Sequence, residues 1–162
     1  MIELGAIPYG MKEVREAYGN PDMNNDGSVD LAWWERNMVR KVLPYAMRAS
    51  WDLSIIASSQ YIHRAVADAM IDALTEIAET VPPEFLQLCD CDILGGVYNL
   101  RTNRRSGTLS MHSFGIAIDL NPHLGPLGGP DNQPEFIKRA FLRRGFVTFP
   151  DDTQHYQAAK DV

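Results

Sequence analysis

Residues 110–119 read Ser-Met-His-Ser-Phe-Gly-Ile-Ala-Ile-Asp, and this stretch decides which fold and which site we expect. Ile116 and Ile118 alternate with small or polar residues, and a period of two is typical of a β-strand. Gly115 directly precedes this pattern and allows a bend or a close approach between backbones. The stretch therefore predicts an extended strand over residues 112–120, entered through a turn, with the aspartate on the face opposite the isoleucines.

Two histidines and an aspartate supply the donors of a metal site. His112 and Asp119 lie seven residues apart within the motif, and His155 follows near the C-terminus. Two imidazoles and one carboxylate are a typical ligand set for a catalytic zinc ion, whose fourth position is left to water. Water activated in this way carries out hydrolysis. His155 must come from a neighbouring strand, and residues 146–149, followed by Pro-Asp-Asp, predict a strand that ends in a turn.

The two motifs together resemble the signature of the zinc D,D- and L,D-peptidases of family M15. That signature is Ser-x-His-x-x-Gly-x-Ala-x-Asp, followed later by an acidic residue, two variable residues and His. Residues 110–119 fill every fixed position of the first part, and residues 152–155 fill the second. Tyr156 stands where the family usually has an aromatic residue. The resemblance is strong over about residues 95–157 and weak before about residue 45.

Within the family, the chain is most similar to phage-type L-alanyl-D-glutamate endopeptidases, which cut the peptide stems of bacterial peptidoglycan. Residues 95–101 before the motif and residues 118–122 at its end support this likeness. Relatives often carry a Gly-Gly-Trp-rich insertion after the position of Phe146, whereas this chain goes directly from Phe149 into Pro-Asp-Asp. The resemblance implies a zinc-dependent endolysin of a phage or prophage. A D-Ala-D-Ala carboxypeptidase and a non-catalytic wall-binding or virion structural protein are the alternatives.

The resemblance also implies roles for single residues. His112, Asp119 and His155 are the expected zinc ligands. Asp152 is the expected general base, which takes a proton from the attacking water and passes it to the leaving amine. Asp151 is its rival, but it lies one position away from the family pattern.

Further residues of the motif region are expected to contact the substrate. Arg101 best matches the family's arginine upstream of the motif, with Arg104 and Arg105 as alternatives. A cation at this place helps to hold a developing oxyanion or a substrate carboxylate. Ser110 is expected either to hydrogen-bond the substrate or to orient a metal ligand.

Composition and charge narrow the class of protein. The 162 residues, 45% of them hydrophobic, suffice for one domain with its own core. A net charge of −6 without a basic block makes nucleic acid an unexpected partner. No stretch is long and apolar enough for a membrane span, and the first residues lack the pattern of a secretory signal. We therefore expect a monomer that is cytoplasmic at synthesis and reaches peptidoglycan through another factor, such as a holin, or from a virion.

The fold class that we expect is α+β, as one zinc peptidase domain over residues 1–162. A helical stripe over about 31–47 and another over 59–80 predict a mainly helical N-terminal part, residues 1–84. Residues 85–157 form the expected metal-site part. Its small antiparallel sheet would carry the zinc and be packed by helices, as in Hedgehog and D,D-peptidase-like proteins.

Residues 22–30 resemble the first nine positions of a calcium-binding loop, including a glycine at the sixth. The twelfth position is Trp33 rather than an acidic residue. We favour a polar turn before a helix, with Asp30 as the N-cap. Cys89 and Cys91 are separated by one residue, which favours two free thiols over a disulfide.

Overall fold

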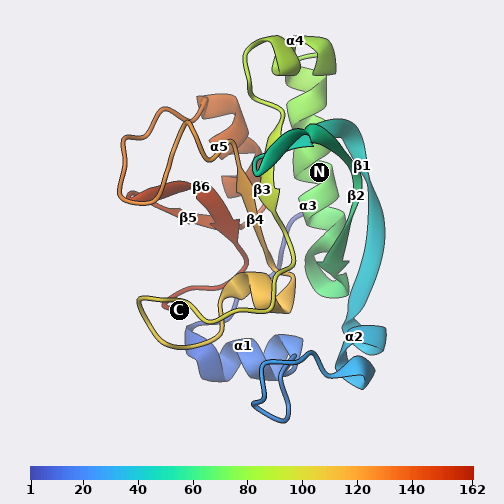
Figure 1. The fold of residues 1–162 in the computed structure, drawn as a ribbon, viewed down its shortest axis with the longest axis vertical. Helices are drawn as coiled ribbons and strands as arrows, with labels where there is room; N and C mark the ends of the chain where they lie inside the picture. Colours follow the sequence, from blue (N-terminus) through green and yellow to red (C-terminus); the bar gives the residue numbers. More distant parts are fainter.

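The computed structural model describes residues 1–162, and a six-stranded sheet runs through it in the order β2-β1-β3-β4-β6-β5 (Figure 1). All neighbouring strands pair antiparallel except β1 and β3, which are parallel. The α+β class is confirmed, but the sheet is mixed rather than purely antiparallel. The strands are β1 (Met38–Ala49), β2 (Asp52–His63), β3 (Ile93–Gly96), β4 (Ala117–Leu120), β5 (Val147–Phe149) and β6 (Asp152–Gln157).

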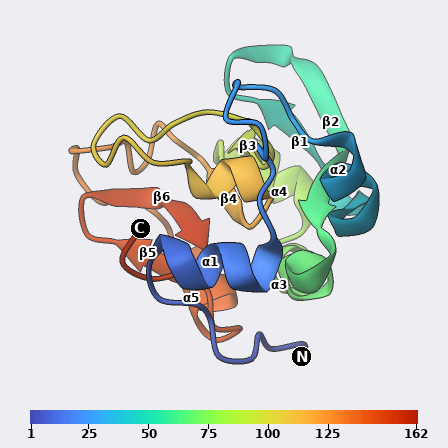
Figure 2. The ribbon, with the colours of Figure 1, turned by 90° about the horizontal axis from the view of Figure 1, so that it is seen from below.

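Helices cover one face of this sheet and leave the other face of β4 and β6 to the site. The long helix α3 packs on β1 and contacts α5, and the N-terminal residues run past both helices (Figure 2). No helix has the length and apolar character that crossing a membrane requires. The helices are α1 (Gly10–Tyr18), α2 (Leu31–Asn37), α3 (Arg64–Thr80), α4 (Pro83–Leu88), the short 3₁₀ helix η1 (Met111–Phe114) and α5 (Glu135–Leu142).

The N-terminal part is not mainly helical, so that prediction is wrong. The helix expected over 31–47 ends at Asn37, and residues 38–63 form the long β1–β2 hairpin instead. Pro44 lies inside the expected helix, near its C-terminal end, where it would remove a backbone hydrogen bond and clash with the preceding turn. From Leu43 onward every second side chain is buried, so this segment follows the period of a strand.

The second expected helix is confirmed over most of its length. The apolar face predicted for it is buried in α3, from Val66 through Met70 to Ile77. The helix begins at Arg64 rather than at residue 59, because residues before it pair with β1. His63 caps it, with its Nδ1 accepting a hydrogen bond from the N–H of Ala65 at 3.1 Å.

The polar segment before α2 is the turn that the sequence favours. Asp30 is confirmed as the N-cap, since its carboxylate accepts the N–H of Trp33 at 2.6 Å. The Asp22 carboxylate accepts the backbone N–H groups of Asp26 and Gly27 at 3.0 and 3.2 Å. These bonds order the loop that leads into α2. Elsewhere in the chain, the two cysteines are free thiols, as expected.

A buried arginine joins the two helices behind the sheet. The side chain of Arg144, at the end of α5, donates to Asp72 and Glu76 of α3 at 2.8 and 2.6 Å and to the carbonyl of Ala140 at 2.7 Å. Arg144 is 3% exposed. Because removal of the guanidinium would leave two partly buried carboxylates without a partner, this network should contribute to the stability of the fold.

We therefore predict that Arg144→Met lowers the free energy of unfolding by about 2 kcal/mol, between the values for surface and buried pairs. The Ile2 N–H and Arg144 hold the pKa of Asp72 below its ordinary value. Burial acts to raise the pKa of Glu76, but Arg144 and Arg143 bring it below its ordinary value. Depressed carboxyl pKa values contribute stability at neutral pH that is lost on acidification below about pH 4.

Urea unfolding of the wild type and of Arg144→Met between pH 7 and pH 3 tests this. The difference between the two proteins should shrink as the pH falls. Arg143→Met is the matched control, because Arg143 is exposed and contacts only Glu76 among the acidic residues. It should cost less than about 1 kcal/mol. An equal loss for the two variants would contradict the role assigned to Arg144.

Candidate metal centre

Strand pairing brings the aspartate and the second histidine together. In the antiparallel β4–β6 pair, Asp119 lies directly opposite His155. Residues in such positions have Cβ atoms about 5 Å apart, within reach of a shared ligand. The Asp119 Oδ1 lies 2.8 Å from His155 Nδ1. The hairpin predicted from residues 146–149 and the turn after them is confirmed as β5 and β6.

The first histidine comes from the 3₁₀ helix η1 rather than from a strand, so the strand predicted over 112–120 begins only at Ala117. The Ser110 hydroxyl caps η1 by accepting the N–H of His112 at 3.3 Å. Gly115 ends it in the left-handed conformation, with φ of 67°. This turn aims the ring so that His112 Nε2 lies 3.2 Å from the Oδ1 of Asp119.

Gly115 is required at this place by a close approach between backbones, as the sequence predicts. A Cβ on Gly115 would lie 2.6 Å from the methyl group of Met38 and 3.0 Å from the backbone N of His63. The carbonyl of Gly115 accepts the N–H of His63 at 2.9 Å. The turn that carries His112 is therefore held against the β1–β2 hairpin.

Hydrogen bonds on the outer ring nitrogens set the tautomers of both histidines. His112 Nδ1 lies 2.7 Å from the carbonyl of Val97, which can only accept. His155 Nε2 lies 2.8 Å from Gln157 Oε1, and the Gln157 amide is oriented by donating its Nε2 to the carbonyl of Ala159 at 2.9 Å. These outer nitrogens, His112 Nδ1 and His155 Nε2, therefore carry the protons. The inner nitrogens, His112 Nε2 and His155 Nδ1, face Asp119 and present lone pairs.

The three inner atoms are acceptors that face one another. His112 Nε2 and His155 Nδ1 are 3.2 Å apart, and all three donor atoms of the His112–Asp119–His155 cluster lie within 4.8 Å of one another. Acceptors this close repel one another unless a proton or a metal ion lies among them. The cluster can therefore hold a metal ion.

The charges of the cluster also favour a cation. Burial acts to raise the pKa of Asp119, but the two imidazoles that face its carboxylate outweigh this effect and hold the pKa well below its ordinary value. Burial acts to lower the pKa of His155, but Asp119 outweighs it and raises the pKa. Asp119 thus remains an anion that stabilises positive charge on its neighbours.

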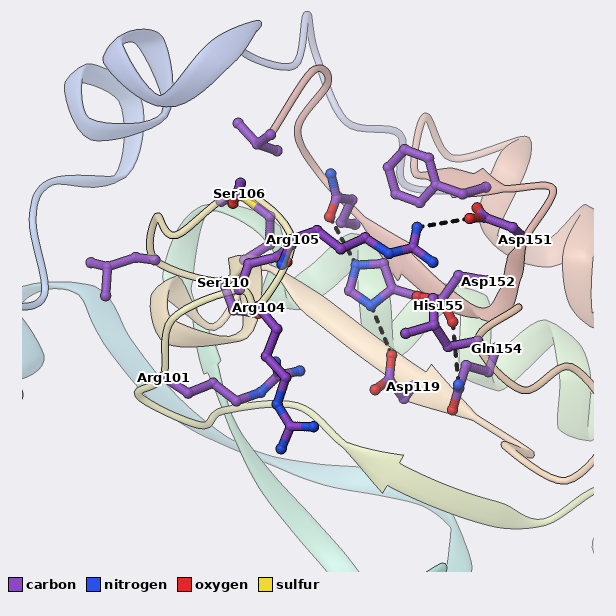
Figure 3. Close-up of a pocket in the computed structure, with 17 residues that line it drawn as sticks. Arg101, Arg104, Arg105, Ser106, Ser110, Asp119, Asp151, Asp152, Gln154 and His155 are labelled. Atoms are coloured by element: carbon purple, nitrogen blue, oxygen red, sulfur yellow. Dashed lines mark hydrogen bonds and ion pairs between the residues drawn. The ribbon is translucent and has the colours of Figure 1, made fainter. Parts of the chain in front are cut away.

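A cleft of about 420 Å³ opens onto the cluster (Figure 3). Asp119 and His155 line its floor, whereas His112 is buried beneath. One wall is the loop of residues 101–111, and the other includes residues 149–154 around the β5–β6 turn. The exposed side of the cluster therefore faces a space in which a substrate can bind.

The two neighbouring aspartates of the β5–β6 turn differ in their surroundings. Asp152 is half-buried in the cleft wall, where burial is the main cause that raises its pKa above the ordinary value. Its Oδ1 accepts a hydrogen bond from Gln154 at 3.2 Å. Asp151 is exposed, and its ion pair with Arg105 at 2.7 Å lowers its pKa. Asp152 is thus the more basic of the two and stays the predicted base.

The predicted substrate-binding residues have different positions. Ser110 is 5% exposed and caps η1, which fits the orienting role better than contact with substrate. Arg101 is exposed in the cleft wall. Its backbone is held by the buried Ser113, whose hydroxyl accepts the N–H of Arg101 at 2.9 Å and donates to its carbonyl at 2.8 Å.

Three contributors to the site are absent from the sequence-based predictions: Ser113, the Val97 carbonyl and Gln157. Gln157 had a detectable signal, since it lies two residues after His155 and therefore on the same face of a strand. Ser113 occupies a variable position inside the motif. The carbonyl of Val97 had no signal, because every residue has one.

No protein-family model, no curated protein and no solved structure matches this chain. The function must therefore be inferred from the chemistry of the site and from the motifs of the sequence.

We predict that Gly95→Ala weakens metal binding although Gly95 is no ligand. A Cβ at this position of β3 would lie 2.7 Å from the Cβ and 3.2 Å from the carbonyl oxygen of Asp119. Strand β3 or β4 must shift, which moves the carboxylate away from the histidines. Loss of support around a metal ligand typically costs about 10–100-fold in affinity.

Competition with a chromophoric zinc chelator measures this affinity. Gly5→Ala is the control, because a Cβ there meets open space. Equal affinity in the wild type and in Gly95→Ala, with both proteins folded, would show that the approach of β3 does not position Asp119.

Proposed function

We propose that this protein is a zinc-dependent peptidase that hydrolyses the peptide stems of bacterial peptidoglycan. The observation that carries the proposal is the His112–Asp119–His155 cluster on the floor of an open cleft, with Asp152 in the wall beside it. Its supporting argument is the match of both sequence motifs to the signature of the M15 peptidases. A Hedgehog and D,D-peptidase-like fold belongs to the same proposal, with two ligands on the antiparallel strands β4 and β6 and the third on η1.

Zinc is the ion that suits these donors. Two imidazole nitrogens and one carboxylate oxygen are typical of catalytic zinc, whereas magnesium and calcium prefer oxygen donors alone. Three protein ligands leave one position free, and it would face the cleft. When bound, zinc lowers the pKa of water and polarises a carbonyl group.

The chain's own residues supply the proton transfers and the positioning. Asp152 accepts a proton from the attacking water and delivers it to the nitrogen of the leaving amine. Its raised pKa suits both steps, because a base that is too acidic would not take the proton. Arg101 is placed in the wall to bind a carboxylate of the peptide.

A phage or prophage endolysin with L-alanyl-D-glutamate endopeptidase activity is the specific form of this proposal. The support is the likeness of residues 95–101 and 118–122 to that group. Digestion of purified peptidoglycan, with mass spectrometry of the new termini, distinguishes cleavage after L-alanine from release of a terminal D-alanine. The net charge of −6 offers no attraction to anionic wall polymers, so delivery to the wall would depend on another factor.

We predict that one zinc ion binds per chain and that chelation abolishes hydrolysis of peptidoglycan. His112→Ala and His155→Ala should each lose both the metal and the activity, because two remaining ligands hold zinc weakly. His123→Ala is the control, since His123 is exposed and lies outside the cluster. Elemental analysis of freshly purified protein measures the metal. Full activity without zinc would refute the proposal.

We predict a different result for the base. Asp152→Asn should keep zinc near full occupancy while activity falls by about 10²–10⁴-fold, the usual contribution of a positioned general base. This corresponds to about 3–5 kcal/mol of transition-state stabilisation. Asp119→Asn should instead weaken the metal itself.

Asp151→Asn is the matched comparison, because it removes the adjacent carboxylate and should change the rate by less than about fivefold. Zinc content and initial rates on the same preparations separate the two effects. If Asp151→Asn abolishes activity while Asp152→Asn leaves it intact, the base has been assigned to the wrong residue.

A further inference from the structure

Three arginines project from one wall of the cleft, and they divide into two groups. Figure 3 shows Arg105 extending past His155 toward Asp151, while Arg101 and Arg104 run toward one another. Arg105 pairs with Asp151 at 2.7 Å, whereas Arg101 and Arg104 make no ion pair. The cleft wall therefore carries arginines at two separate places, one without an ion pair and one neutralised by Asp151.

The loop that carries the arginines has an ordered backbone. Asn103 donates its N–H to the Thr108 carbonyl at 2.6 Å and accepts the N–H of Gly107 at 2.8 Å. Its side chain also accepts the N–H of Arg105 at 2.9 Å. The backbone that carries Arg104 and Arg105 is thus held at the edge of the cleft by its own hydrogen bonds. Two guanidinium groups that converge without a carboxylate repel each other, and an anion between them removes that repulsion.

The ion pair of Arg105 with Asp151 is suited to exchange. Both side chains are exposed, 62% and 53%, and pairs of this kind contribute little to stability. The backbone of Asp151 is fixed independently, because its carbonyl accepts the N–H of Gly128 at 2.6 Å. The Asp151 carboxylate can therefore rotate away from Arg105 without moving the β5–β6 turn.

We propose that the cleft has two carboxylate-binding positions, one formed by Arg101 with Arg104 and one formed by Arg105, and that a substrate carboxylate displaces Asp151 from Arg105. This inference rests on the proposed function and specifies its substrate class: a peptide with two free carboxylates close to the cleaved amide. In the free protein Asp151 occupies the second position as a competitor. Amidation of either substrate carboxylate then weakens binding at one position only.

Binding of three N-acetylated peptides tests the proposal. The first is L-Ala-γ-D-Glu-L-Lys with both carboxylates free, the second is amidated on glutamate, and the third is amidated at the C-terminus. Titration calorimetry with zinc-loaded Asp152→Asn protein measures affinity while cleavage is slow, and mass spectrometry after each titration checks that the peptide is intact. This background should bind the first peptide about tenfold more tightly than either amide, the value of a charged hydrogen-bonded pair.

The two groups of arginines should respond in a complementary way. Arg105→Gln should abolish the preference for one of the two carboxylates and keep the other, and Arg104→Gln should do the reverse. Asp151→Asn should tighten binding of the first peptide about two- to fivefold, because it removes the competitor, and should have no such effect when combined with Arg105→Gln.

Asp68→Asn is the matched control. Asp68 of α3 forms an exposed ion pair with Lys41 of β1 at 2.7 Å, away from the cleft. Asp68→Asn makes the same change of net charge as Asp151→Asn, and it should leave peptide affinity unaltered. If Arg105→Gln and Arg104→Gln affect the same carboxylate, or neither, the two-position proposal is overturned while the peptidase proposal stands. If no variant binds any peptide and the wild type cleaves none, both are overturned.

Discussion

The pairing of β4 with β6 is the constraint on which the site depends. It places Asp119 opposite His155 on the cleft side and Ile118 opposite Tyr156 in the core. Because side chains alternate along a strand, a slip of one residue would bury the carboxylate and expose the isoleucine. The free energy of burying Ile118 and Tyr156 therefore also fixes the register that brings two of the three side chains of the candidate metal centre together.

The third side chain of the candidate metal centre depends on a part of the chain that lies far away in sequence. The turn that carries His112 is held by a backbone hydrogen bond from His63, at the junction of β2 and α3, and by close packing of Met38 against Gly115. The β1–β2 hairpin thus supports the site without contributing a ligand. The Val97 carbonyl and Gln157 fix both imidazoles by their outer nitrogens, so the cluster is oriented by the protein itself.

The distribution of charge around the site differs from that of the whole protein. The chain carries a net charge of −6, yet three arginines project from a single wall of the cleft. The lining of the cleft also contains three aspartates, and one of them, Asp151, is paired with Arg105, so the unpaired positive charge lies at Arg101 and Arg104. The candidate metal cluster and the arginines are thus separate groups of side chains that line the same cleft.

Several features of this protein follow from the sequence by itself, because they are encoded by residues close together in the chain. The alternation around Ile118 identified β4, the apolar stripe through Met70 identified α3, and Asp30 marked the start of α2. The three candidate metal ligands, His112, Asp119 and His155, could also be predicted, because residue type and spacing are properties of the sequence.

Other features were decided only by the tertiary structure. The segment around Pro44 carried a mixed pattern of apolar residues, and its pairing with β2 and β3 resolved the ambiguity in favour of a strand. The separation of Arg105 from Arg101 and the binding of Asp151 to Arg105 are likewise invisible in the sequence. The ion pair of Arg105 with Asp151, for example, joins residues 46 positions apart. Local propensity and spacing carry no information about such pairs, because only the packing of the whole chain brings them within a few ångströms.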